Sequence, residues 1–65
     1  MKYTVMVGLA NATVDSWRLD IKASTPERAK ERAIKDMEKR DWVRLRNVTV
    51  TGATVYDRYG KVVLR

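Results

Sequence analysis

Apolar and polar residues alternate over two stretches near the start of the chain. In residues 2–9 the apolar side carries Tyr3, Val5, Val7 and Leu9, and the other side carries Lys2, Thr4, Met6 and Gly8. In residues 14–23 the apolar side carries Trp17, Leu19, Ile21 and Ala23, and the other side carries Ser16, Arg18, Asp20 and Lys22. A period of two residues predicts strands with one buried face, and the short loop around Asn11 predicts a hairpin.

Residues 24–41 predict the only helix of the chain. The apolar residues of this segment fall on one stripe, which consists of Ala29, Ala33, Ile34 and Met37. Two signals for the helix start lie side by side. Ser24 with Glu27 fits a capping box, whereas Thr25 before Pro26 fits an N-cap residue followed by proline at the first helical position. The sequence leaves both starts open.

Further strand segments are predicted after the helix. In residues 42–46 apolar side chains are interleaved with Arg44 and Arg46, which favours an edge strand whose charges discourage aggregation. In residues 48–56 the apolar parity changes at Gly52, where a β-bulge would keep all the apolar side chains on one side, namely Val48, Val50, Ala53 and Val55. Residues 57–60 match a type I turn, and residues 61–65 predict a short closing strand.

These elements predict a single α+β domain over residues 1–65. The expected architecture is two-layer ββαββ, with a four-stranded, mostly antiparallel sheet and one helix packed on one of its faces. Because the helix returns the chain across the sheet, the third strand is expected beside the first, which gives the strand order 2-1-3-4. The other face of the sheet would then be open.

The composition argues against catalysis and metal binding. The 65 residues include no histidine and no cysteine, which removes the commonest general base, the commonest metal ligand and any thiolate nucleophile. The serines, Ser16 and Ser24, fall on a predicted strand and at a predicted helix cap. The three glycines are isolated and form no phosphate-binding loop. We therefore expect no enzyme activity, no metal, no cofactor and no small-molecule substrate.

The formal net charge is +6, and most of the excess lies in the last third of the chain. Residues 42–65 hold five basic side chains against one acidic side chain, a net charge of +4. Positive charge beside aromatic rings on an open sheet is typical of surfaces that follow phosphates and stack bases. We therefore expect a non-enzymatic domain that binds DNA or RNA, or assists a nucleic-acid-processing complex, through a basic C-terminal sheet surface. The predicted contact residues are Arg44, Arg46, Tyr56, Arg58, Tyr59 and Lys61, with Arg18 and Lys22 from the second strand.

A secondary basic stripe runs along the predicted helix and consists of Arg28, Arg32, Lys35 and Lys39. Acidic residues form an adjacent stripe, so the helix carries six basic and five acidic side chains. Two interpretations stay open for this face. It is either solvated and laced with ion pairs, or it is a docking surface for phosphates or for an acidic partner.

The alternative function is a protein-interaction module, such as an inhibitor or accessory subunit. A single-layer sheet exposes two edges, and pairing at an edge would give a homodimer or extend the sheet of a partner protein. The helix could instead dock into a groove of another protein, and the expected protein partner is acidic. Trp42, at the end of the helix, is expected either to cover the core or to anchor an interface. No stretch is apolar enough to span a membrane and no secretion signal is evident, so we expect a cytoplasmic location.

Overall fold

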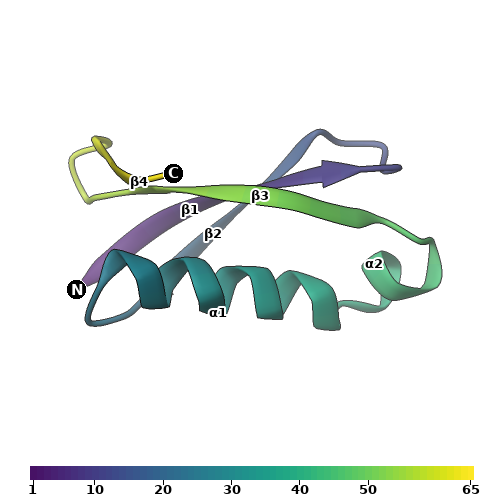
Figure 1. Cartoon of the computed structure of the whole chain (residues 1–65), viewed down its shortest axis with the longest axis horizontal. Helices are drawn as coiled ribbons and strands as arrows, with labels where there is room; N and C mark the ends of the chain where they lie inside the picture. The colour runs from purple at the N-terminus through teal and green to yellow at the C-terminus, as the bar shows by residue number, and fades with distance from the viewer.

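Four strands and two helices make up the computed structural model, which describes residues 1–65. The strands are β1 (Lys2–Ala10), β2 (Ser16–Lys22), β3 (Thr49–Tyr56) and β4 (Val62–Leu64), and the helices are α1 (Pro26–Lys39) and α2 (Asp41–Leu45). The sheet is antiparallel throughout in the order β2-β1-β3-β4, and α1 runs along one of its faces (Figure 1). The predicted two-layer α+β fold and its strand order are confirmed.

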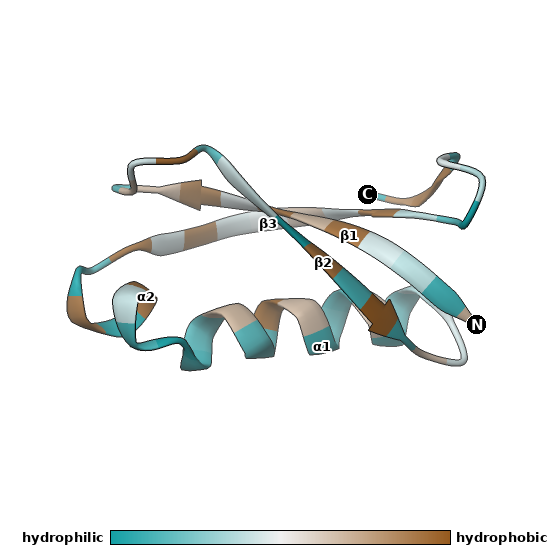
Figure 2. Cartoon of the chain, turned by 180° about the vertical axis from the view of Figure 1, so that it is seen from behind, coloured by the Kyte–Doolittle hydropathy of each residue, from teal (hydrophilic) through white to brown (hydrophobic).

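The core lies between α1 and the middle of the sheet. Val5 of β1 stands opposite Leu19 of β2 and Val55 of β3, and Val5, Val7 and Val55 are fully buried. Because side chains alternate across a strand, the residues between them point to the other face. Figure 2 shows this alternation as apolar and polar bands along the strands. Burial of each such valine stabilises the fold by about 1.5–3 kcal/mol relative to its exposure.

Helix α1 begins at the second of the two predicted start signals. The Thr25 side chain accepts a hydrogen bond from the Arg28 N–H at 3.2 Å, and Pro26 occupies the first helical turn. The buried side of the helix consists of Ala29, Ala33 and Met37. Two of these side chains are small, so the helix backbone can approach the sheet closely. Neither helix of the structure is long and apolar enough to cross a membrane.

The predicted strand at residues 42–46 is wrong, because residues 41–45 form the short helix α2. The Val43 and Arg44 N–H groups both donate to the Arg40 carbonyl, and the Arg44 side chain bonds to Asp41 at 2.6 Å. Only Val43 of this helix is buried, and Leu45 is 77% exposed. A run of five residues with a single buried side chain is compatible with a helical turn and with a short strand. Here the backbone hydrogen bonds to the Arg40 carbonyl make the segment helical.

Trp17 is less buried than its place in the alternating pattern predicts. It stands opposite Val7 and so lies on the helix side of the sheet, yet it is 37% exposed. Its ring packs against Trp42 of α2, with ring centroids 5.3 Å apart, and the Arg40 guanidinium lies 6.0 Å from the Trp17 ring centroid. The two tryptophans therefore close the edge of the core near α2, and Trp42 packs against the core, which is the first of the two roles predicted for it.

Strand β3 contains the predicted bulge. Gly8 pairs with Gly52, whereas the next residue, Leu9, pairs with Val50, so Thr51 is the extra residue. The predicted turn is also present, because the Gly60 N–H donates to the Asp57 carbonyl at 3.0 Å. Gly60 has a φ of 81°, a conformation that costs most other residues about 1–2 kcal/mol.

Removal of the Met37 side chain tests the position of the core. Met37→Ala is expected to lower the free energy of unfolding by about 2–5 kcal/mol, because it leaves a cavity between α1 and the sheet. Urea denaturation followed by circular dichroism measures this change. Met6→Ala is the matched control, because Met6 lies on the other face of the sheet and is half-buried. Equal losses in the two variants would contradict the placement of the core on the α1 side alone.

Substitution of Gly60 tests the turn between β3 and β4. Gly60→Ala is expected to lower the free energy of unfolding by about 1 kcal/mol, because alanine disfavours the positive φ at this position. Gly60→Asn is expected to lose less, since asparagine tolerates the left-handed region. The same denaturation measurement compares the two variants. An equal loss in both would show that the backbone conformation of residue 60 is not the cause.

Candidate nucleic-acid interface

One face of the sheet is covered by α1, and the other face is free of any helix (Figure 1). Residues directly opposite each other on neighbouring strands share a face, so the register places the uncovered side chains in rows. The rows are Lys22 with Lys2; Asp20 with Thr4 and Tyr56; and Arg18 with Met6 and Thr54. We call these residues the uncovered face. It combines basic side chains with one aromatic ring and one carboxylate.

Arg18 lies in the middle of the outer strand β2 on the uncovered face. Its guanidinium group is 3.7 Å from Asp20 Oδ1, which also accepts a hydrogen bond from the Thr4 hydroxyl at 3.2 Å. The Arg18 and Asp20 side chains are 66% and 50% exposed. An ion pair this exposed contributes only about 0–1 kcal/mol. The positive charge of Arg18 therefore remains accessible to an anion.

The turn between β3 and β4 carries further positive charge. The Arg58 guanidinium lies 4.9 Å from the Tyr59 ring centroid and donates to the Tyr59 hydroxyl at 2.7 Å. The Asp57 carboxylate, in contrast, accepts the backbone N–H groups of Tyr59 and Lys61, each at 2.9 Å. Asp57 Oδ1 therefore holds the turn together, and Asp57 forms no ion pair with the basic side chains of the turn.

A hollow of about 390 Å³ lies on the uncovered face, between this turn and β2. Its lining residues are Thr4, Met6, Arg18, Tyr56, Asp57, Arg58 and Gly60. The turn curves away from α1 (Figure 1), and its residues Asp57, Arg58 and Gly60 line one side of the hollow. Three predicted contact residues therefore come together here, namely Arg18, Tyr56 and Arg58.

The remaining basic residues at this end of the sheet extend the same surface. Lys2 and Lys22 form the row next to that of Tyr56, at the end of the sheet where the turn lies. Tyr59 and Lys61 lie in the turn itself, and Tyr59 is 79% exposed. Positive charge therefore concentrates at one end of the uncovered face.

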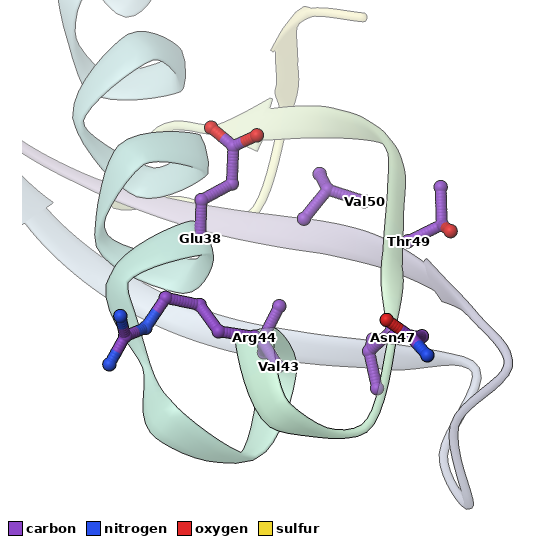
Figure 3. Close-up of a pocket in the computed structure, with 7 residues that line it drawn as sticks. Glu38, Val43, Arg44, Asn47, Thr49 and Val50 are labelled. Atoms are coloured by element: carbon purple, nitrogen blue, oxygen red, sulfur yellow. The ribbon is translucent and has the colours of Figure 1, made fainter.

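Arg44 does not belong to this surface, contrary to the predicted sheet location. It lies on α2 and lines a second hollow with Glu38, Val43, Asn47, Val48, Thr49 and Val50. Figure 3 shows its side chain extending away from Asn47 and Thr49. The Arg44 guanidinium is paired with Asp41 at 2.6 Å, so part of its charge is offset locally. The sequence pattern failed here because it assigned α2 to the sheet.

Arg46 is likewise separated from the uncovered face. It follows α2 and lines a hollow with the two tryptophans, Trp17 and Trp42, and with Thr13 and Val14 of the β1–β2 loop. This hollow lies on the helix side of β2, where Trp17 packs. The prediction that Arg44 and Arg46 extend a basic sheet surface is therefore wrong in its geometry.

The predicted stripe on α1 lies in the other layer of the molecule. Arg28, Arg32 and Lys35 line a hollow there, but Glu31 lies among them. The Arg32 guanidinium donates to the Lys22 carbonyl at 2.7 Å, which ties the helix to the end of β2. Lys39, the fourth member of the stripe, is not among the lining residues. This arrangement favours the interpretation of a mainly solvated, structural helix face.

The predicted contact residues included none of the three β1 residues of the uncovered face, namely Lys2, Thr4 and Met6. The signal was present, because these residues alternate with Tyr3, Val5 and Val7 on a strand predicted to be central. Combined with the strand order 2-1-3-4, this parity places Met6 beside Arg18 and Thr4 beside Tyr56.

No group of three or more carboxylate, histidine or cysteine side chains lies close enough to hold a metal ion. Comparison of the chain with protein-family models, with curated proteins and with solved structures finds no match.

Proposed function

We propose that this protein is a non-enzymatic domain that binds a nucleic-acid strand on the uncovered face of its sheet. The observation that carries the proposal is the meeting of Arg18, Tyr56 and Arg58 around one hollow that no helix covers. In this arrangement the guanidinium groups bind phosphates from two sides of the hollow. The Tyr56 ring, which lines the same hollow, offers a surface on which a base can stack.

The charge balance supports an anionic ligand. Of the 14 basic side chains, only Arg18, Arg40 and Arg44 form ion pairs, and all three pairs are substantially exposed. The net charge of +6 therefore attracts a polyanion over a long range, while the uncovered face supplies the short-range contacts. Phosphate neutralisation by Lys and Arg releases counterions, so binding should weaken steeply as salt rises.

A single strand suits this face better than a duplex. Its bases are unstacked and can reach Tyr56 and the thioether of Met6, which lie in neighbouring rows. The mixed Thr, Met and Tyr surface provides no dense set of base-edge donors and acceptors. We therefore propose binding with little sequence preference. The proposed location is the cytoplasm, and the proposed function includes no catalytic step.

A charge-matched pair of double variants tests the proposed location. Arg58→Ala with Lys61→Ala removes two basic groups at the turn beside the uncovered face. Arg44→Ala with Arg46→Ala removes the same charge on and after α2. Arg18 is left in place because its removal also frees Asp20. Fluorescence anisotropy with a labelled single-stranded oligonucleotide over a salt series gives the affinity and its salt dependence.

The turn variant is expected to lose about tenfold in affinity and to reduce the slope of log K against log salt concentration by roughly 1.4, the value for two lost phosphate contacts. The α2 variant is expected to keep the slope of the unmodified protein. Equal changes in the two variants would place binding on net charge alone. If the unmodified protein does not bind the oligonucleotide at low salt, the proposal is wrong.

A further inference from the structure

The outer edge of β2 is unpaired along most of its length. The Leu9 N–H donates to the Asp15 carbonyl at 2.8 Å, and Met1 and Ala23 exchange hydrogen bonds of 2.9 and 3.0 Å. Hydrogen-bonded pairs alternate with non-bonded pairs in an antiparallel ladder, so odd-numbered residues of β2 bond to β1. The backbone groups of Ser16, Arg18, Asp20 and Lys22 therefore point outward. Of these, only the Lys22 carbonyl has a partner within the chain, the Arg32 side chain at 2.7 Å.

We infer that a second copy of this chain pairs with this edge, β2 against β2 in antiparallel fashion, about a two-fold axis at Leu19. In this register Arg18 of each copy stands opposite Asp20 of the other. Both residues have outward backbone groups, so each of these pairs can exchange both of its backbone hydrogen bonds. The Arg18 guanidinium and the Asp20 carboxylate lie on the same face of the sheet, so the side chains attract each other across the new junction.

Charge selects this register over its neighbours. A shift that centres the axis on Arg18 places two Arg18 side chains opposite each other. A shift that centres it on Asp20 opposes two carboxylates and places Arg18 opposite Lys22. Like charges directly opposite each other destabilise a strand pair. A shift by a single residue places residues whose backbone groups point outward opposite residues whose backbone groups bond to β1. The hydrogen bonds between the two copies are then lost.

The helix side of β2 supplies apolar contacts in the same register. Leu19 stands opposite Leu19 of the second copy, and Trp17 stands opposite Ile21. Trp17 is 37% exposed and Ile21 is half-buried, so both have apolar surface still to cover. Helix α1 packs mainly on β1 and β3 and contacts β2 less, which leaves room beside the edge.

The other edge of the sheet is a poorer template. Strand β4 has only three residues, and the Arg65 carbonyl just beyond it is bonded to the Lys30 side chain at 3.1 Å. Pairing about a two-fold axis at β2 stops at a dimer, because it uses the one long free edge of each copy. The dimer therefore has a continuous sheet in which the short β4 strands are outermost.

Charge reversal at the two central residues tests this dimer. Arg18→Asp places the introduced carboxylate opposite Asp20 of the second copy, and Asp20→Arg places two guanidinium groups opposite each other. Each single variant is expected to be monomeric, whereas the unmodified protein is dimeric. An equimolar mixture of the two variants is expected to form a heterodimer, and the double variant is expected to regain the homodimer. Size-exclusion chromatography with light scattering, without nucleic acid, gives the mass, and native mass spectrometry identifies the heterodimer.

Recovery on mixing shows that each single variant still folds. The inference would be overturned if the unmodified protein were monomeric at every protein concentration measured. Single variants that remain dimeric would also overturn it. Loss of the dimer without recovery in either the mixture or the double variant would also overturn it. None of these results depends on whether the protein binds nucleic acid.

A cysteine at the axis supplies an independent measurement. The chain contains no cysteine, so any disulfide in a single-cysteine variant joins two copies. Leu19 forms a non-bonded pair with itself across the axis, where Cα atoms are about 4.5 Å apart, within the range of a disulfide. Leu19→Cys is expected to cross-link under mild oxidation on a non-reducing gel. Val63→Cys on β4 is the exposed control, and equal cross-linking of the two would contradict the β2 interface.

Discussion

The structure depends on the contact between the alanine side of α1 and the valines at the centre of the sheet. Ala29 and Ala33 are small enough for the helix to lie close to Val5 and Val55, and all four are fully buried. A chain of 65 residues with one long helix can cover only one face of a four-stranded sheet. The other face must therefore be compatible with water, which is why Thr, Lys and Arg alternate with apolar residues along β1 and β2.

This one-sided burial also explains where the charges can act. Side chains on the uncovered face are held by a rigid sheet but remain exposed, so their ion pairs are weak and exchangeable. The turn between β3 and β4 adds Arg58 at one end of the face, while Asp57 Oδ1 accepts two backbone hydrogen bonds within the turn. Carboxylates lie among the basic residues on both sides of the sheet, but on the helix side Arg44 is paired with Asp41 at 2.6 Å and Arg32 is bonded to the Lys22 carbonyl at 2.7 Å.

The sequence predicted the fold well wherever a single local pattern had one physical solution. Strict alternation in β1 and the parity change at Gly52 each had one. The start of α1 had two, at Ser24 and at Thr25, and the structure selects Thr25. Residues 41–45 also lacked a single solution, because five residues with one buried side chain fit a helical turn and a short strand equally. That error wrongly placed Arg44 and Arg46 on the predicted sheet surface. Trp17 was misjudged because parity gives the side of the sheet but not the distance from its edge, where a side chain stays partly exposed.

The two proposed surfaces meet at Arg18. Pairing at β2 would place Arg18 and Asp20 of both copies around the axis and would join the two uncovered faces into one continuous surface. A guanidinium group has five N–H donors in a planar fork, so Arg18 can donate to Asp20 of the second copy and still present donors to a phosphate. The basic ends of the two faces, around Tyr56 and the turn, would lie on opposite sides of the axis. A strand bound across the dimer would then run over β2 between two basic ends, and each copy would supply one of them.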